Sequence, residues 1–149
     1  MAGKVHFHRV MTAPPERIFR AFSTPEALAK WLPPHGFSAK MHTFEFKVGG
    51  GYKMSFHNLT TGSSHSFNAK YTEIKENQSL KYLNIFDNPH MPGEMLTTVQ
   101  LKKVMCGTEL TITQEGIPDM IPVEMCTLGW QQSLELLTQL VTPEIPDQG

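Results

Sequence analysis

The spacing of apolar and polar residues divides the chain into elements. Residues 4–12 are rich in Val, Phe and His, which predicts a strand. Apolar side chains then share one face of residues 14–23, which indicates a short helix with proline at its start. Residues 24–32 predict a second short helix, with Thr24 as its N-cap and with the prolines at 33 and 34 after its end.

From residue 37 to residue 115 the hydrophobic period is two, which is typical of strands. Phe44, Phe46 and Val48 alternate with polar residues, so the first strand of this run should continue to the glycines at 49–51, which predict a turn or bulge. Six consecutive strands with short connections predict an antiparallel meander. Their expected ranges are 37–50, 52–56, 66–74, 79–86, 94–105 and 108–115.

The last element is a long amphipathic helix that should begin near Pro122 and end at Val141. Its apolar positions are three or four residues apart: Trp130, Leu134, Leu137 and Val141. Gly129 stands directly before Trp130, although glycine inside a helix costs about 1 kcal/mol relative to alanine. Two explanations are open: a strand approaches the glycine closely, or open volume lies beside the indole.

This order of elements, β-α-α-β6-α, predicts an α+β fold with one domain over residues 1–141. A single sheet must bury its apolar face, and the long helix is the element available to cover it. The sheet is therefore expected to curve around that helix, and a cavity remains wherever their side chains do not meet. Residues 142–149 are polar and proline-bearing, so we expect a frayed tail.

Composition narrows the function classes. The net charge of −1 and the lack of a basic stripe argue against nucleic-acid binding, and no apolar run has the length of a membrane span. The N-terminus has no apolar stretch of signal-peptide length, and the two cysteines do not form a disulfide framework, so the cytoplasm is the expected location. An antiparallel sheet with exposed edges can pair with itself, so a homodimer is an assembly that the sequence allows.

Five ordered segments also resemble a known family. They are "APPERIFRAFSTPEALAKWL", "FEFKVGGGYKM", "YTEI", "GTELTITQEGIPD" and "GWQQSLELLTQL". The chain resembles the START-like superfamily (SRPBCC, helix-grip fold), and within it the branch named for the activator of the ninety-kilodalton heat-shock protein ATPase. The resemblance implies a curved antiparallel sheet around a C-terminal helix, a cavity for a hydrophobic small molecule, and a relation to the stress response. Chaperone activation is not implied, because the protein that gives the branch its name is larger.

The sequence departs from the family pattern at three places. Members often carry an acid and then an arginine before the double glycine, where this chain has Glu45 and Lys47. They often have two consecutive tryptophans after the second helix, where this chain has Trp31 followed by Leu32. A histidine is common shortly before the Gly-Trp pair, and none stands there in this chain.

Candidate chemistry is sparse. Seven histidines are present, and His6 and His8 should share one face of a strand, but no spacing typical of a metal site occurs. No cofactor motif or nucleophile elbow is visible. Glu124 falls in the first turn of the long helix, where the positive end of the helix dipole stabilises its negative charge. A catalytic constellation is therefore not predicted.

The leading hypothesis is a binding protein for a small hydrophobic or amphipathic ligand, without catalysis of its own. Two alternatives stay open: a cyclase- or hydrolase-type enzyme that uses Tyr71, Glu45 or a histidine, and an interaction module that acts on a chaperone or on a second copy of the chain. Residues 33–36 and 87–93 are expected at the rim of the cavity. The candidate ligand-binding residues are Trp31, Phe46, Met54, Phe56, Phe67, Tyr71, Phe86, Trp130 and Leu134.

Overall fold

The computed structural model describes residues 3–86, 94–119 and 121–146. The elements follow the predicted order of one strand, two short helices, six strands and one long helix. They are β1 (Gly3–Met11), α1 (Pro15–Ser23), α2 (Pro25–Trp31), β2 (Phe37–Phe44), β3 (Gly51–Asn58), β4 (Ser64–Lys75), β5 (Ser79–Phe86), β6 (Glu94–Val104), β7 (Gly107–Ile117) and α3 (Val123–Val141).

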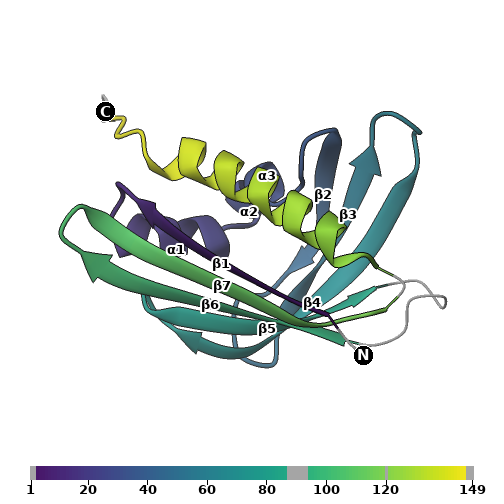
Figure 1. The fold of residues 1–149 in the computed structure, drawn as a ribbon, viewed down its shortest axis with the longest axis horizontal. Helices are drawn as coiled ribbons and strands as arrows, with labels where there is room; N and C mark the ends of the chain where they lie inside the picture. Colours follow the sequence, from purple (N-terminus) through teal and green to yellow (C-terminus); the bar gives the residue numbers. More distant parts are fainter. Residues whose placement is uncertain (1–2, 87–93, 120, 147–149) are drawn as a thin grey trace.

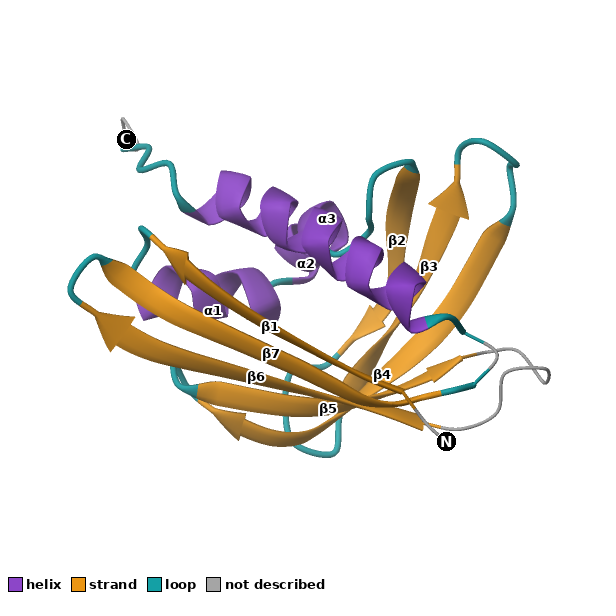
Figure 2. Ribbon diagram, in the orientation of Figure 1, coloured by secondary structure: helices purple, strands orange, loops and turns teal. Residues whose placement is uncertain are grey.

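All seven strands form one antiparallel sheet in the order β1-β7-β6-β5-β4-β3-β2. The sheet bends so that β2 and β3 rise beside α3, while β1, β7, β6 and β5 pass beneath it (Figure 1). All three helices lie on the concave side of the sheet (Figure 2). The helix-grip α+β fold is confirmed.

Alternation along the strands determines which side chains face the concave side of the sheet. Tyr52 and Met54 on β3 and Ala69 and Tyr71 on β4 are all buried, as the period of two predicts. The helix contributes the expected stripe of buried residues, which are Trp130, Leu134, Leu137 and Val141. Sheet and helix therefore meet through two apolar surfaces that sequence periodicity identifies correctly.

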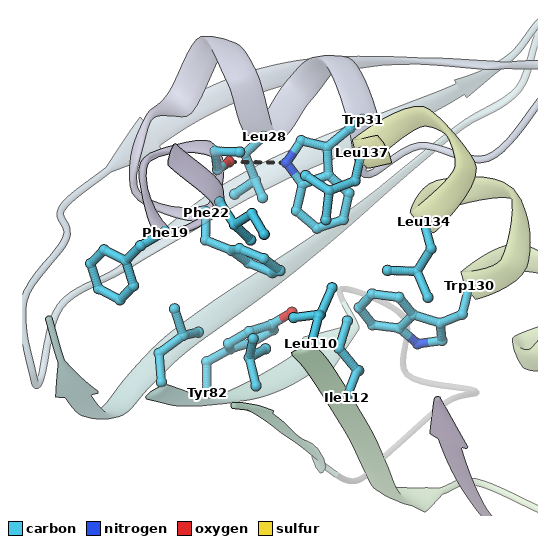
Figure 3. Close-up of a cluster of buried hydrophobic side chains, with 14 of the residues drawn as sticks. Phe19, Phe22, Leu28, Trp31, Tyr82, Leu110, Ile112, Trp130, Leu134 and Leu137 are labelled. Atoms are coloured by element: carbon cyan, nitrogen blue, oxygen red, sulfur yellow. Dashed lines mark hydrogen bonds between the residues drawn. The ribbon is translucent and has the colours of Figure 1, made fainter. Parts of the chain in front are cut away.

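The space beneath the second half of α3 is filled by the two short helices. Trp31 at the end of α2 is fully buried, and its ring meets that of Phe22 edge to face at 4.8 Å between centroids. Its indole Nε1 donates a hydrogen bond to the carbonyl oxygen of Ala21 at 2.9 Å (Figure 3). Leu28 and Leu137 close the same cluster (Figure 3), so this end of the molecule is solid core.

The strand prediction for residues 45–50 is wrong. The strand predicted to continue to residue 50 ends at Phe44, and Val48 is exposed rather than turned inward. Gly49 takes a left-handed φ of +88°, and its N–H donates to the carbonyl oxygen of Tyr71 on β4, so the backbone leaves the ladder with β3. Thr24 occupies the N-cap of α2, as predicted, although its side chain makes no capping hydrogen bond.

The long helix ends at Val141, at the predicted residue. Arg17 donates a hydrogen bond from its guanidinium to the carbonyl oxygen of Val141 at 3.0 Å, which ties α1 to this end of α3. The boundary between a domain at 1–141 and a frayed tail at 142–149 stays a prediction, and residues 147–149 lie outside the described part of the chain.

Candidate ligand-binding cavity

A cavity of about 440 Å³ lies between the first half of α3 and the concave face of the sheet. This volume falls within the range of about 300–1,000 Å³ that is typical of small-molecule sites. Seven aromatic residues line the wall: Phe37, Tyr52, Phe56, Phe67, Tyr82, Phe86 and Trp130. Leu32, Pro34, His65, Ser66, Asn84, Met95, Gln114, Cys126, Gly129 and Ser133 complete it.

The cavity exists because α3 presents small side chains at this end. Cys126, Gly129 and Ser133 line the void, whereas large apolar residues occupy the same face further along the helix. A Cβ atom added to Gly129 would meet no other atom within 4 Å, apart from its chain neighbours and its own helix backbone. Of the two explanations for this glycine, open volume beside the indole is therefore correct, and close approach of a strand is wrong.

Four of the nine candidate ligand-binding residues lie in the cavity wall. They are Phe56 on β3, Phe67 on β4, Phe86 on β5 and Trp130 on α3. The segment expected at the rim contributes Pro34. The other expected rim, residues 87–93, lies outside the described residues.

The other five candidates lie in the core and do not line this cavity. Trp31 packs on α1, and Leu134 points into the cluster of Figure 3. Phe46 stacks edge to face on Tyr71 at 4.9 Å between ring centroids, and both are away from the void. Met54 is fully buried.

A polar group in the cavity was not predicted. Asn84 on β5 and Gln114 on β7 line the void, and Thr97 on β6 connects them by hydrogen bonds of 3.1 and 3.2 Å. The indole Nε1 of Trp130 donates to Oε1 of Gln114 at 3.1 Å, which extends the network to α3. The available signal was a polar residue at an inward-facing position of three consecutive strands, a position that is otherwise apolar.

Burial holds the two tyrosines and the cysteine of the wall in their neutral forms. Burial raises the pKa of the Tyr52 hydroxyl, and it raises the pKa of the Tyr82 hydroxyl, an effect that a hydrogen bond with Thr97 partly offsets. Burial also raises the pKa of the Cys126 thiol. His65 is exposed and lies at the edge of the cavity. At neutral pH the tyrosine hydroxyls can donate hydrogen bonds to a ligand or accept them from it, but they do not act as bases.

The groups considered for acid–base chemistry do not meet at this cavity. Glu45 is exposed, and its carboxylate lies 3.6 Å from the ammonium of Lys47. Tyr71 lies in the core, and its buried hydroxyl has no hydrogen-bond partner within the described chain. His6 and His8 share the outer face of β1, as predicted, where they contact Thr113 and Glu109 respectively.

Between residues 3 and 146, apart from the gaps, no three side chains of the metal-ligating types are grouped closely enough to hold an ion. Within the same part of the chain, no helix combines the length and the apolarity that crossing a bilayer requires.

Comparison with known proteins places the chain in a family. A family model described as "Activator of Hsp90 ATPase homolog 1-like protein" matches residues 12–142. The chain belongs to this family. A protein from Chromobacterium violaceum shares 49% sequence identity with this chain, and its crystal structure matches with a TM-score of 0.93. The match covers 95% of this chain and 98% of that protein.

More distant solved structures share the fold. A protein from Rhodobacter sphaeroides matches at 21% identity and a TM-score of 0.81, over 94% of this chain and 95% of its own. A protein from Nitrosomonas europaea matches at 19% identity and a TM-score of 0.80, over 93% of each chain. A comparison with curated proteins finds no match. The recognised family therefore establishes the fold and names no ligand.

Proposed function

We propose that the protein binds a small hydrophobic or amphipathic molecule in the cavity between α3 and the sheet, without catalysis of its own. The observation that carries the proposal is the aromatic-walled volume of about 440 Å³. Helix residues Cys126, Gly129 and Ser133 leave this space open, although larger side chains would fill it. When an apolar molecule enters this space, its surface and the aromatic surface of the wall are both removed from water, which favours binding.

The two cysteines provide a direct test, because Cys126 lines the cavity and Cys106 is exposed at the turn between β6 and β7. In a Cys106→Ser variant, alkylation by iodoacetamide reports on Cys126 alone. The thiolate is the form that reacts with iodoacetamide, and burial raises the pKa of the Cys126 thiol. The rate of alkylation should therefore increase at a more alkaline pH than it does for a free cysteine.

The expected result is that 2-isopropenylnaphthalene, an apolar probe, slows alkylation of Cys126 severalfold and raises the midpoint of thermal unfolding. The matched control is a Cys126→Ser variant, in which the exposed Cys106 should be alkylated at the same rate with and without the probe. Unchanged rates at Cys126, together with an unchanged unfolding midpoint across a panel of apolar probes, would contradict the proposal.

One observation favours an interaction module as a second candidate. The first half of α3 exposes Val123, Met125 and Leu128, of which Met125 is 66% accessible. Exposed apolar side chains grouped at a helix end are typical of contact surfaces. A second copy of the chain is the partner to test first, because light scattering then gives the answer directly. A monomeric mass at every protein concentration would remove self-association from consideration.

A further inference from the structure

A row of polar side chains crosses the concave face of the sheet. Thr97 on β6 stands directly opposite Tyr82 on β5 and Gln114 on β7, and Asn84 lies one inward position further along β5. All four are at most 7% exposed. A buried polar row is costly unless its members satisfy one another, so its hydrogen bonds decide what it offers to the cavity.

The indole of Trp130 gives this row a direction. An indole N–H can only donate, so the group of Gln114 that faces it must be the carbonyl Oε1. The Nε2 amino group of Gln114 then donates to Oγ1 of Thr97. Thr97 has one hydroxyl proton, and it donates that proton to Oδ1 of Asn84. The indole fixes the orientation of the Gln114 amide, and the structure places Oδ1 of Asn84 on the Thr97 hydroxyl, which sets the orientation of the Asn84 amide.

Asn84 therefore presents a defined group to the cavity that it lines. Its carbonyl oxygen accepts from Thr97, so the group it can offer a ligand is its Nδ2 amino group, a hydrogen-bond donor. The wall around it carries no Lys, Arg, Asp or Glu side chain among the described residues. Beside Asn84 a carboxylate would lose its hydration without a Lys or Arg partner from the described wall, which is unfavourable, and the imidazole of His65 lies exposed at the edge of the cavity.

From this arrangement we propose that the cavity selects an uncharged ligand with an apolar body and a hydrogen-bond acceptor, such as a ketone or amide carbonyl, that is received by Asn84. This inference rests on the proposed binding function. The aromatic wall accommodates the apolar body, and the network behind Asn84 holds the donor in one orientation before the ligand arrives. Preorganisation of this kind lowers the entropic cost of binding.

Three naphthalene derivatives of similar shape test the inference by isothermal titration calorimetry. 2-Acetylnaphthalene carries the acceptor, 2-isopropenylnaphthalene replaces the carbonyl oxygen by a methylene group, and 2-naphthoate carries a negative charge. The ketone should bind about fivefold to tenfold more tightly than the alkene, which corresponds to one hydrogen bond. The naphthoate should bind at least about tenfold more weakly than the ketone, because its carboxylate loses hydration.

Variants locate the preference at Asn84. Asn84→Leu keeps the size of the side chain and removes the donor, so the ratio of ketone to alkene affinity should fall to about one. Ser133→Ala is the matched control, because Ser133 lines the cavity but donates to the carbonyl oxygen of Leu32, outside the network. That variant should keep the wild-type ratio.

The outcomes separate the two proposals. Binding of none of the probes would overturn the binding function and this inference together. Equal affinities for ketone and alkene in the wild-type protein, or naphthoate binding as tight as that of the ketone, would overturn this inference and leave the binding function standing. The wild-type series needs no variant, so it decides the matter even if Asn84→Leu fails to fold.

Discussion

The two halves of α3 cover the same sheet in different ways. Beneath Leu134, Leu137 and Val141 the helix meets α1, α2 and the sheet in close-packed core. Beneath Cys126, Gly129 and Ser133 it spans the cavity. One amphipathic helix thus performs two tasks, and the size of its inward side chains decides which task each half performs. Stability and binding should therefore respond to substitution at different positions of the same helix.

The largest effect is expected in the solid half. Leu137→Ala removes a fully buried side chain and should lower the free energy of unfolding by about 2–5 kcal/mol, because the close-packed surroundings collapse only in part. Chemical denaturation in urea measures this change. The matched substitution in the open half is Cys126→Ala, for which we expect a loss below about 1 kcal/mol. Equal losses at the two positions would break the comparison.

The second largest effect on the free energy of unfolding is expected from the loss of a hydrogen bond at the roof of the cavity. Trp130→Phe leaves Oε1 of the buried Gln114 without its donor and should cost about 1–3 kcal/mol in the free energy of unfolding. Tyr71→Phe is the opposite case, because it removes a buried hydroxyl that has no partner within the described chain. That variant should be neutral or gain up to about 1 kcal/mol, and a loss above 1 kcal/mol would contradict the assignment.

The smallest effect on stability, with a large effect on binding, is expected at Gly129. Gly129→Ala should raise the free energy of unfolding by up to about 1 kcal/mol, because alanine favours the helix and its Cβ enters open space. Gly129→Leu should leave stability near that of the wild type and reduce the affinity for 2-acetylnaphthalene by at least about tenfold, because the side chain fills the cavity. Marked destabilisation by both substitutions would mean that the space is not open.

The sequence predicts the fold correctly, but it predicts only some of the residues that line the cavity. Periodicity identifies the inward face of each element, and for that reason Phe67 and the stripe of α3 were predicted correctly. It does not say where two inward faces separate, because that depends on the distance between helix and sheet. Trp31 and Leu134 are apolar, inward-facing residues like Trp130, yet they lie in the close-packed core.

The polar row was missed for a related reason. Asn84, Thr97 and Gln114 each interrupt an apolar alternation, and a single interruption is unremarkable within one strand. Their significance depends on the register of β5, β6 and β7, which brings the three side chains within hydrogen-bonding distance. Register is a relation between strands, so one strand's pattern does not contain it.

The pairing of β1 with β7 also governs how the chain folds. His6 and Thr113 are in contact although 107 residues separate them along the chain. Closing so long a loop costs entropy that only the completed sheet repays, so folding should be slow compared with that of a helical bundle of similar size. On a ribosome β1 must wait until β7 has emerged, and the concave surface of β2–β6 stays uncovered until α3 follows. The nascent chain therefore exposes to the cell the same aromatic surface that later encloses the cavity.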